Sequence, residues 1–269
     1  MNVRAGAASL RERIKSIFHY RNMIYSLVKR DLKGRYRNSA FGFLWNFMNP
    51  LFQIIIYYIA FSALVFRDMP AYYIFLPCGM IPWHFFSSSV SAGSSCIVSN
   101  GGMVKKINFP REVVPITLVT KNLVNFMIAY TIVFLMVIVT DFGFNGMALL
   151  FLPVIILIEY VFILGLVFLT SSVDVYYRDI SQIMGVLMMG MIWVTPVIYR
   201  NYMIESTLLE TIIKYNPMTY FMNVIHDIMY FKVIPDMFDL IICMILAVAA
   251  IVIGWLTFVK LQRGFAEEL

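Results

Sequence analysis

Charged residues are scarce in this chain of 269 residues. They make up 13% of the sequence, whereas an average soluble domain has about 25%. Hydrophobic residues reach 61% and aromatic residues 16%, which argues against a soluble domain and predicts a membrane protein. The formal net charge of +6 on such an apolar chain indicates basic segments that face anionic lipid, so no nucleic-acid partner is expected.

Residues that bind metals, form disulfides or hold phosphates are also few. The three cysteines are widely spaced and unpaired, which excludes a disulfide framework and a zinc site. No two of the three histidines have metal-ligand spacing on one helix, so we expect no metal and no catalytic residue. The chain has no G-x-x-x-x-G-K-[ST] loop, and we therefore expect it to bind no cofactor of its own.

Long apolar stretches dominate what is present. A hydrocarbon core about 30 Å thick needs roughly 20 apolar residues as helix, and helices satisfy their own backbone hydrogen bonds in lipid. We therefore predict an all-α, polytopic membrane protein with six transmembrane helices. The predicted spans are residues 40–66, 71–96, 113–140, 148–172, 180–199 and 238–259.

The distribution of lysine and arginine predicts the orientation of these spans. Cytoplasmic segments carry an excess of basic residues. Sixteen of the 21 lysines and arginines precede the first predicted span, follow the last one, or lie in the second-to-third and fourth-to-fifth connections, and Lys121 near the start of the third span is counted with them, which makes seventeen. The opposite side holds Arg67, Arg200, Lys214 and Lys232. Both termini of this multi-pass protein are therefore expected in the cytoplasm.

The first 37 residues differ in composition from the remainder. Leu10, Ile14, Ile17, Ile24, Val28 and Leu32 recur at helical spacing, with basic residues off that stripe. This pattern predicts an amphipathic interfacial helix, which anchors the chain on anionic lipid and can also dock a partner. We divide the chain into this segment, residues 1–37, and a six-span transmembrane domain, residues 38–269.

The segment before the last predicted span is neither a turn nor a full span. Asn201 to Asp239 carries Pro217 and Pro235 between runs of Met, Tyr, Phe and Ile. We expect short re-entrant helices there, which require surrounding protein or a wet cavity.

Four sequence motifs occur in a fixed order, followed by a fifth before the last span. They are RDLKGRYRNSAFGFLWNFMNPL (Arg30–Leu51), GMIPWHFF (Gly79–Phe86), NGGMVKKINFPREVVP (Asn100–Pro115), DVYYRDI (Asp174–Ile180) and NPMTYF (Asn216–Phe221). Their order, spacing and predicted sidedness resemble the membrane (permease) subunit of type-2 ABC exporters, in the branch that moves O-antigen, capsule and teichoic-acid chains. The resemblance covers nearly the whole chain.

The resemblance implies that the connection between the second and third spans is a coupling helix that fits a groove in an ATPase subunit. Phe109 offers an apolar anchor, and Arg111 with Glu112 can pair across an interface. An ordinary cytoplasmic turn with positive-inside charges is the alternative for this loop, and helix capping is the alternative for the DVYYRDI residues. The expected coupling residues are Lys105, Asn108, Phe109, Pro110, Arg111, Glu112, Tyr177, Arg178, Asp179, Asp31, Arg35 and Tyr36.

Aromatic residues are expected to line a passage for the glycan, because sugars stack their C–H faces on aromatic rings. In the family that the chain resembles, the first, second and fifth spans line this passage. Aromatic belts at both membrane interfaces are the alternative for the same residues. The candidates are Trp45, Tyr57, Tyr58, Tyr72, Tyr73, Trp83, Phe86, Trp193 and Tyr199.

Taken with the resemblance, the sequence predicts a transporter permease and no enzyme. The expected partners are two copies of an ATPase subunit that binds ATP and Mg, a second copy of this chain, membrane lipid and a lipid-linked glycopolymer. Two alternatives stay open at this point. One is a related permease for a small amphiphile or drug, and the other is a membrane glycosyl- or acyltransferase.

Overall fold

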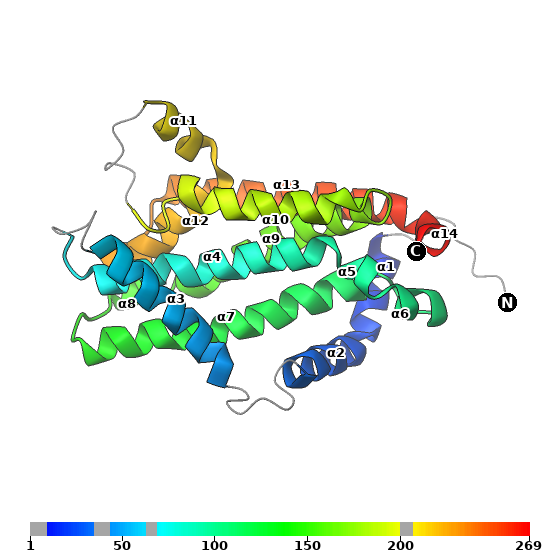
Figure 1. Cartoon of the computed structure of the whole chain (residues 1–269), viewed down its shortest axis with the longest axis horizontal. Coiled ribbons are helices and arrows are strands. Elements are labelled where there is room, and N and C mark those ends of the chain that lie inside the picture. Colours follow the sequence, from blue (N-terminus) through cyan, green and yellow to red (C-terminus); the bar gives the residue numbers. More distant parts are fainter. Residues whose placement is uncertain (1–9, 35–43, 63–68, 200–206) are drawn as a thin grey trace.

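The computed structural model describes residues 10–34, 44–62, 69–199 and 207–269, and every regular element in these ranges is a helix (Figure 1). The prediction of an all-α protein is therefore confirmed. The helices are α1 Leu10–His19, α2 Arg21–Gly34, α3 Trp45–Ser62, α4 Tyr72–Ser94, α5 Cys96–Ser99, α6 Gly101–Lys106, α7 Val113–Val139, α8 Gly146–Leu149, α9 Leu152–Asp174, α10 Asp179–Met191, α11 Thr207–Tyr215, α12 Pro217–His226, α13 Met237–Leu261 and α14 Phe265–Glu268, with short turns η2 Ile192–Val194, η4 Asp227–Phe231 and η5 Gln262–Gly264.

The long helices form a bundle, with the short helices at its ends (Figure 1). Helix α9 is the centre of the packing, because it contacts α4, α7 and α13. Its tightest neighbour is α13, where a Cβ on Gly254 would overlap the carbonyl oxygen of Gly165. Small residues let helices approach closely in membranes, where packing drives association. Helices α1, α5, α6 and α14 gather at the end of the bundle that holds the C-terminus, and α8 lies at the opposite end.

Three helices of the described residues are long and apolar enough to cross a membrane: Val113–Val139, Gly146–Asp174 and Met237–Glu268. The other three predicted spans fall on α3, α4 and α10. Helices α3 and α10 belong to shorter apolar stretches, Met48–Phe61 and Asp179–Val194. A multi-pass membrane protein is thus supported, while the count of six spans stays a prediction.

The predicted N-terminal amphipathic helix is two helices, α1 and α2, separated at Tyr20. Helix α2 packs against α7. Val28 on α2 is buried, whereas Lys29 and Arg30 beside it are exposed. This division of the surface agrees with the amphipathic pattern.

Short helices α11 and α12 occupy part of the segment predicted to be re-entrant. Helix α12 begins where the Asn216 side chain accepts a hydrogen bond from the Met218 amide at 3.0 Å, with Pro217 in the first turn, which is a favourable helix start. The Asn216 amide also donates to the Thr195 hydroxyl at 2.7 Å. The NPMTYF motif therefore ties α12 to the end of the fifth predicted span, and its insertion into the membrane stays a prediction.

Candidate functional site

The connection between α6 and α7 presents an exposed surface. Lys105, Ile107 and Asn108 are exposed, and the apolar Ile107 side chain is 53% exposed. Phe109 is half-buried and packs against the core of its own chain. Phe109 is the apolar anchor predicted from the motif, but the Ile107 side chain is more accessible.

Glu112 lies directly before α7 and is only 2% exposed. Its Oε1 accepts a hydrogen bond from Arg13 at 3.0 Å and another from the Gln262 side chain at 3.1 Å. The expectation that Glu112 pairs across an interface with another protein does not fit this burial. Instead, Glu112 joins α1, α7 and the C-terminal segment within the chain.

Arg111 is also bound within the chain. It donates a hydrogen bond to the carbonyl oxygen of Gln262, and its guanidinium lies 5.7 Å from the centre of the Phe265 ring, within reach of a cation–π interaction. Burial lowers the pKa of Arg111, and the neighbouring Glu112 carboxylate opposes that shift. Phe265 is fully buried and meets Phe258 edge-on at 5.6 Å.

The DVYYRDI motif reaches the same C-terminal segment. Tyr176 donates a hydrogen bond to the carbonyl oxygen of Leu261 at 2.9 Å, and its ring lies 6.5 Å from that of Phe265. The next three residues, Tyr177, Arg178 and Asp179, are exposed. The third and fourth motifs therefore converge on residues 261–265.

We call the residues that make these contacts the C-terminal cluster. Its residues lie far apart in the sequence. None of the five motifs contains Arg13, Gln262 or Phe265, so their contact with the predicted coupling residues could not be predicted from the motifs. The cluster consists of Arg13, Arg111, Glu112, Tyr176, Gln262 and Phe265.

The remaining coupling candidates make none of the contacts that define the C-terminal cluster. Asp31 pairs with Arg30 at 2.9 Å and lines a pocket, away from the C-terminal cluster. Pro110 is half-buried beside Phe109. Arg35 and Tyr36 lie outside the described residues.

The aromatic candidates fall into two groups. Trp83 and Phe86 are each 2% exposed and pack in the core, as Tyr72 does, whose hydroxyl donates to the Ile198 carbonyl at 3.1 Å. Tyr58 and Trp193 are exposed, Trp193 by 55%. The buried side chains fill the core of the chain and do not face a passage, whereas Tyr58 and Trp193 lie at the surface.

The half-buried aromatic candidates Tyr57, Tyr73 and Tyr199 belong to neither group. The Tyr57 ring stacks on Phe61 at 5.9 Å, and Phe61 lies 6.1 Å from the Trp193 ring. Tyr199 donates a hydrogen bond to the Trp193 carbonyl at 2.9 Å, and Tyr73 packs partly buried against the core. These contacts bring the ends of the first and fifth predicted spans together.

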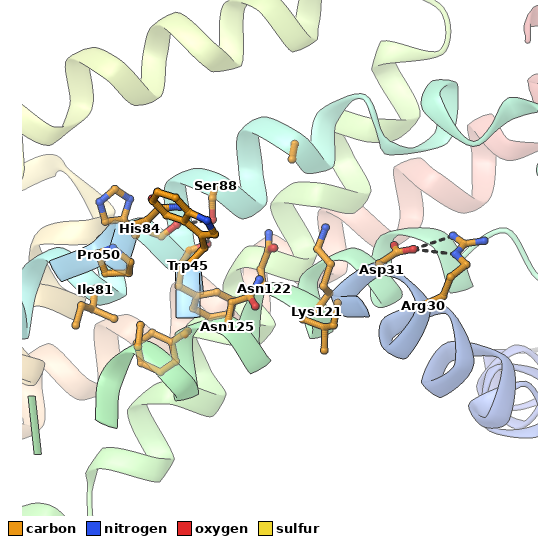
Figure 2. A pocket seen from close by; sticks show the side chains of 16 residues that line it. Arg30, Asp31, Trp45, Pro50, Ile81, His84, Ser88, Lys121, Asn122 and Asn125 are labelled. Carbon is orange, nitrogen blue, oxygen red and sulfur yellow. Dashed lines mark hydrogen bonds and ion pairs between the residues drawn. The ribbon is translucent and has the colours of Figure 1, made fainter. Parts of the chain in front are cut away.

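A pocket of about 730 Å³ lies between α2, α3, α4 and α7. Figure 2 shows its labelled side chains in a row, from the ion pair of Arg30 and Asp31 at one end, past Lys121 and Asn125, to Trp45 and His84 at the other. Of these residues, Asp31 is a predicted coupling residue and Trp45 a predicted passage residue. The overlooked signal is the placement of Lys121, Asn122 and Asn125 on one side of α7, since residues four apart share a helix face.

The apolar helices and the exposed segment at one end of the bundle define a class, the multi-pass helical membrane proteins. Comparison with known families is more specific, because residues 22–230 match the family model described as ABC-2 type transporter. The chain belongs to this family of transporters, so it is a transporter component and not an enzyme. Membership implies an ATPase partner in a transporter complex.

Individual relatives match over nearly the whole chain. The chain is 31% identical over 260 residues to the O-antigen export system permease protein RfbA of Myxococcus xanthus, covering 95% of this chain and 98% of the relative. It is 28% identical over 256 residues to a protein of the same name from Klebsiella pneumoniae, covering 92% of this chain and 95% of the relative. The resemblance found in the motifs is thus confirmed.

Proposed function

We propose that the chain is the membrane subunit of an ABC exporter that moves a lipid-linked polysaccharide across a prokaryotic inner membrane. The observation that carries this proposal is the similarity, over 95% of the chain, to a relative named as an O-antigen export permease. In the proposed complex, two copies of the chain bind two copies of an ATPase subunit, and both termini face the cytoplasm. The chain does no covalent chemistry.

The exposed residues around the C-terminal cluster support ATPase docking at this end of the bundle. Ile107 and Tyr177 are apolar or aromatic side chains exposed by 53% and 70%, next to the charged side chains of Lys105, Arg178 and Asp179. An exposed apolar centre with a polar rim is the usual composition of a binding surface. The C-terminal cluster lies behind this surface and connects α1, α7 and the end of α13. Movement of the bound ATPase subunit would therefore be transmitted to these helices together.

The proposed passage runs between the two copies of α3 and α10. Both helices expose apolar side chains, among them Ile56 and Ile59 on α3 and Val186 and Met189 on α10. Helices α3 and α10 both contact α4, and the Phe61 ring at the end of α3 lies 6.1 Å from the Trp193 ring that follows α10, so these ends of the two helices meet. A second copy packed there would cover these apolar side chains.

Cysteine labelling tests the proposed six-span topology. Cysteines at Lys105, Arg178 and Glu267 are expected to react with a membrane-impermeant maleimide only from the cytoplasmic side, and cysteines at Phe144 and Val233 only from outside. The three native cysteines are buried and serve as the unlabelled background. Labelling of positions 105 and 144 from the same side would exclude the six-span arrangement.

Truncating the exposed anchors tests ATPase docking. We expect Ile107→Ala and Tyr177→Ala each to weaken association with the ATPase subunit by about ten- to thirtyfold, because losing a buried anchor costs about 1.5–2 kcal/mol. Co-purification at decreasing concentration measures the change. Ile234→Ala is a matched control, since Ile234 is 52% exposed and lies on the other side in the proposed topology. Unchanged complex yield in both test variants would leave this surface as an ordinary loop.

A further inference from the structure

The pocket between α2, α3, α4 and α7 has the size of a ligand site. Its volume of about 730 Å³ falls within the range of roughly 300–1,000 Å³ typical of pockets that hold small molecules. This volume suits the head group of a lipid-linked glycan but not a polymer. Apart from Asp31 and Trp45, the residues that line the pocket are candidates for neither ATPase coupling nor the glycan passage.

Besides α2, three helices direct polar side chains toward this pocket. His84 and Ser88 on α4, and Lys121 and Asn125 on α7, are each spaced four residues apart and line the cavity, as do Trp45 and Asn49 on α3. Residues at this spacing share a helix face. Polar side chains in apolar helices are costly and mark binding sites or substrate pathways, so their convergence on one cavity indicates a ligand.

Two buried polar atoms at the pocket lack a partner among the described residues. They are Nε2 of His84 and Oδ1 of Asn125. Buried polar groups in folded proteins nearly always have a hydrogen-bond partner. The Asn125 oxygen requires a donor, and a ring nitrogen requires a donor or an acceptor. A sugar hydroxyl can serve either atom, because it both donates and accepts.

The opposite end of the pocket is positively charged. Arg30 and Lys121 line it with a single carboxylate, Asp31, and Asp31 is 2.9 Å from Arg30. The net positive charge of these three residues favours an anion. Lysine and arginine are the usual phosphate-binding side chains. Trp45 adds an aromatic surface to the wall.

We propose that this pocket binds the phosphorylated sugar head group of a lipid-linked glycan, with sugar hydroxyls at His84 and Asn125 and the phosphate toward Lys121. The proposal rests on the proposed function, since it assigns a loading site to the exported substrate. On the proposed topology, the pocket lies beside the interfacial helix α2 on the cytoplasmic side. A lipid carrier could then remain in the bilayer while its head group enters the pocket.

Binding to the full chain in lipid nanodiscs tests the proposal, with a polyprenyl diphosphate that carries one hexose as the probe. We expect Asn125→Leu and His84→Phe each to weaken binding by about tenfold, the size of one lost hydrogen bond. Ala92→Phe, which places a ring in the pocket, should abolish it. Thr131→Val is the matched control, because Thr131 is exposed on α7 and bonds only to the Ile128 carbonyl of its own helix, at 2.6 Å. Asn125→Asp is a second variant in case Asn125→Leu does not fold. Aspartate keeps the shape of asparagine, and its negative charge should weaken phosphate binding even more.

Competing ligands identify the occupant. Polyprenyl diphosphate without the sugar, and the soluble hexose 1-phosphate, should each bind at least about tenfold more weakly than the probe. Equal binding of hexose 1-phosphate would make the occupant a soluble sugar phosphate and overturn the lipid-linked assignment. Displacement by phosphatidylglycerol, or unchanged binding in Asn125→Leu, Asn125→Asp and Ala92→Phe, would also overturn it. Binding of the ATPase subunit is measured on the same preparations. Loss of ATPase binding would count against the proposed function, whereas loss of glycan binding alone would count against the pocket. The two outcomes can be distinguished because no pocket residue belongs to the C-terminal cluster.

Discussion

Replacing Glu112 with lysine is expected to abolish export. The variant places a second positive charge beside Arg13, where the native carboxylate accepts hydrogen bonds from Arg13 at 3.0 Å and from Gln262 at 3.1 Å. Breaking a buried pair costs about 3–5 kcal/mol, and we expect about 3 kcal/mol here, since the Arg13 side chain is 24% exposed. Thermal unfolding and ATPase-dependent export are measured, and we expect a lower melting temperature and a loss of export.

Two further variants separate this effect from a general response to added charge. Glu267→Lys makes the same change at an exposed position of the C-terminal segment, and it should leave melting temperature and export unchanged. The swap Arg13→Glu with Glu112→Arg restores opposite charges and should recover part of the loss. A Glu112→Lys protein with native melting temperature and full export would show that the cluster does not support the docking surface.

Phe265→Ala is expected to destabilise the same end of the bundle by about 3–5 kcal/mol, as large-to-small changes of buried aromatic residues do. The side chain is fully buried, and its ring meets Phe258 at 5.6 Å and Tyr176 at 6.5 Å. Its loss also removes the aromatic partner of Arg111. Thermal unfolding in detergent measures the stability, and co-purification measures ATPase binding.

Phe265→Leu and Phe238→Ala are the controls for this variant. Leucine keeps most of the buried apolar volume and should recover more than half of the stability. Phe238 is 66% exposed on α13, so its truncation removes an aromatic ring without opening a core cavity and should change the melting temperature little. If Phe265→Ala retains both native stability and ATPase binding, the C-terminal segment does not hold the coupling residues in place.

The sequence predicted the helices better than the contacts between them. Apolar length is a local property, so each predicted span overlaps a helix of the structure, although those of the first and fifth spans, α3 and α10, belong to shorter apolar stretches. The break at Tyr20 between α1 and α2 escaped prediction, because the apolar stripe continues across it. The exposure of Tyr177 and Arg178 agrees with their expected place in a docking surface.

Contacts between residues far apart in the chain could not be predicted from the sequence. Glu112 meets Arg13 across 99 residues and Gln262 across 150, and a single sequence carries no signal that pairs such positions. The burial of Trp83 and Phe86 was missed for a related reason. An aromatic residue in a predicted span faces lipid, a passage or the core depending on its neighbours, and these are known only from the fold.

Reconstituted transport tests whether the chain and an ATPase subunit together export a lipid-linked glycan. The chain would be co-purified with its ATPase subunit, placed in vesicles, and supplied with a fluorescent lipid-linked glycan on the side where the ATPase is accessible. We expect the glycan to reach the opposite side only when ATP and both subunits are present, and we expect the chain alone neither to hydrolyse ATP nor to move the glycan. Glycan movement without the ATPase subunit, or ATP-driven movement of a small amphiphile while the glycan stays in place, would contradict this expectation.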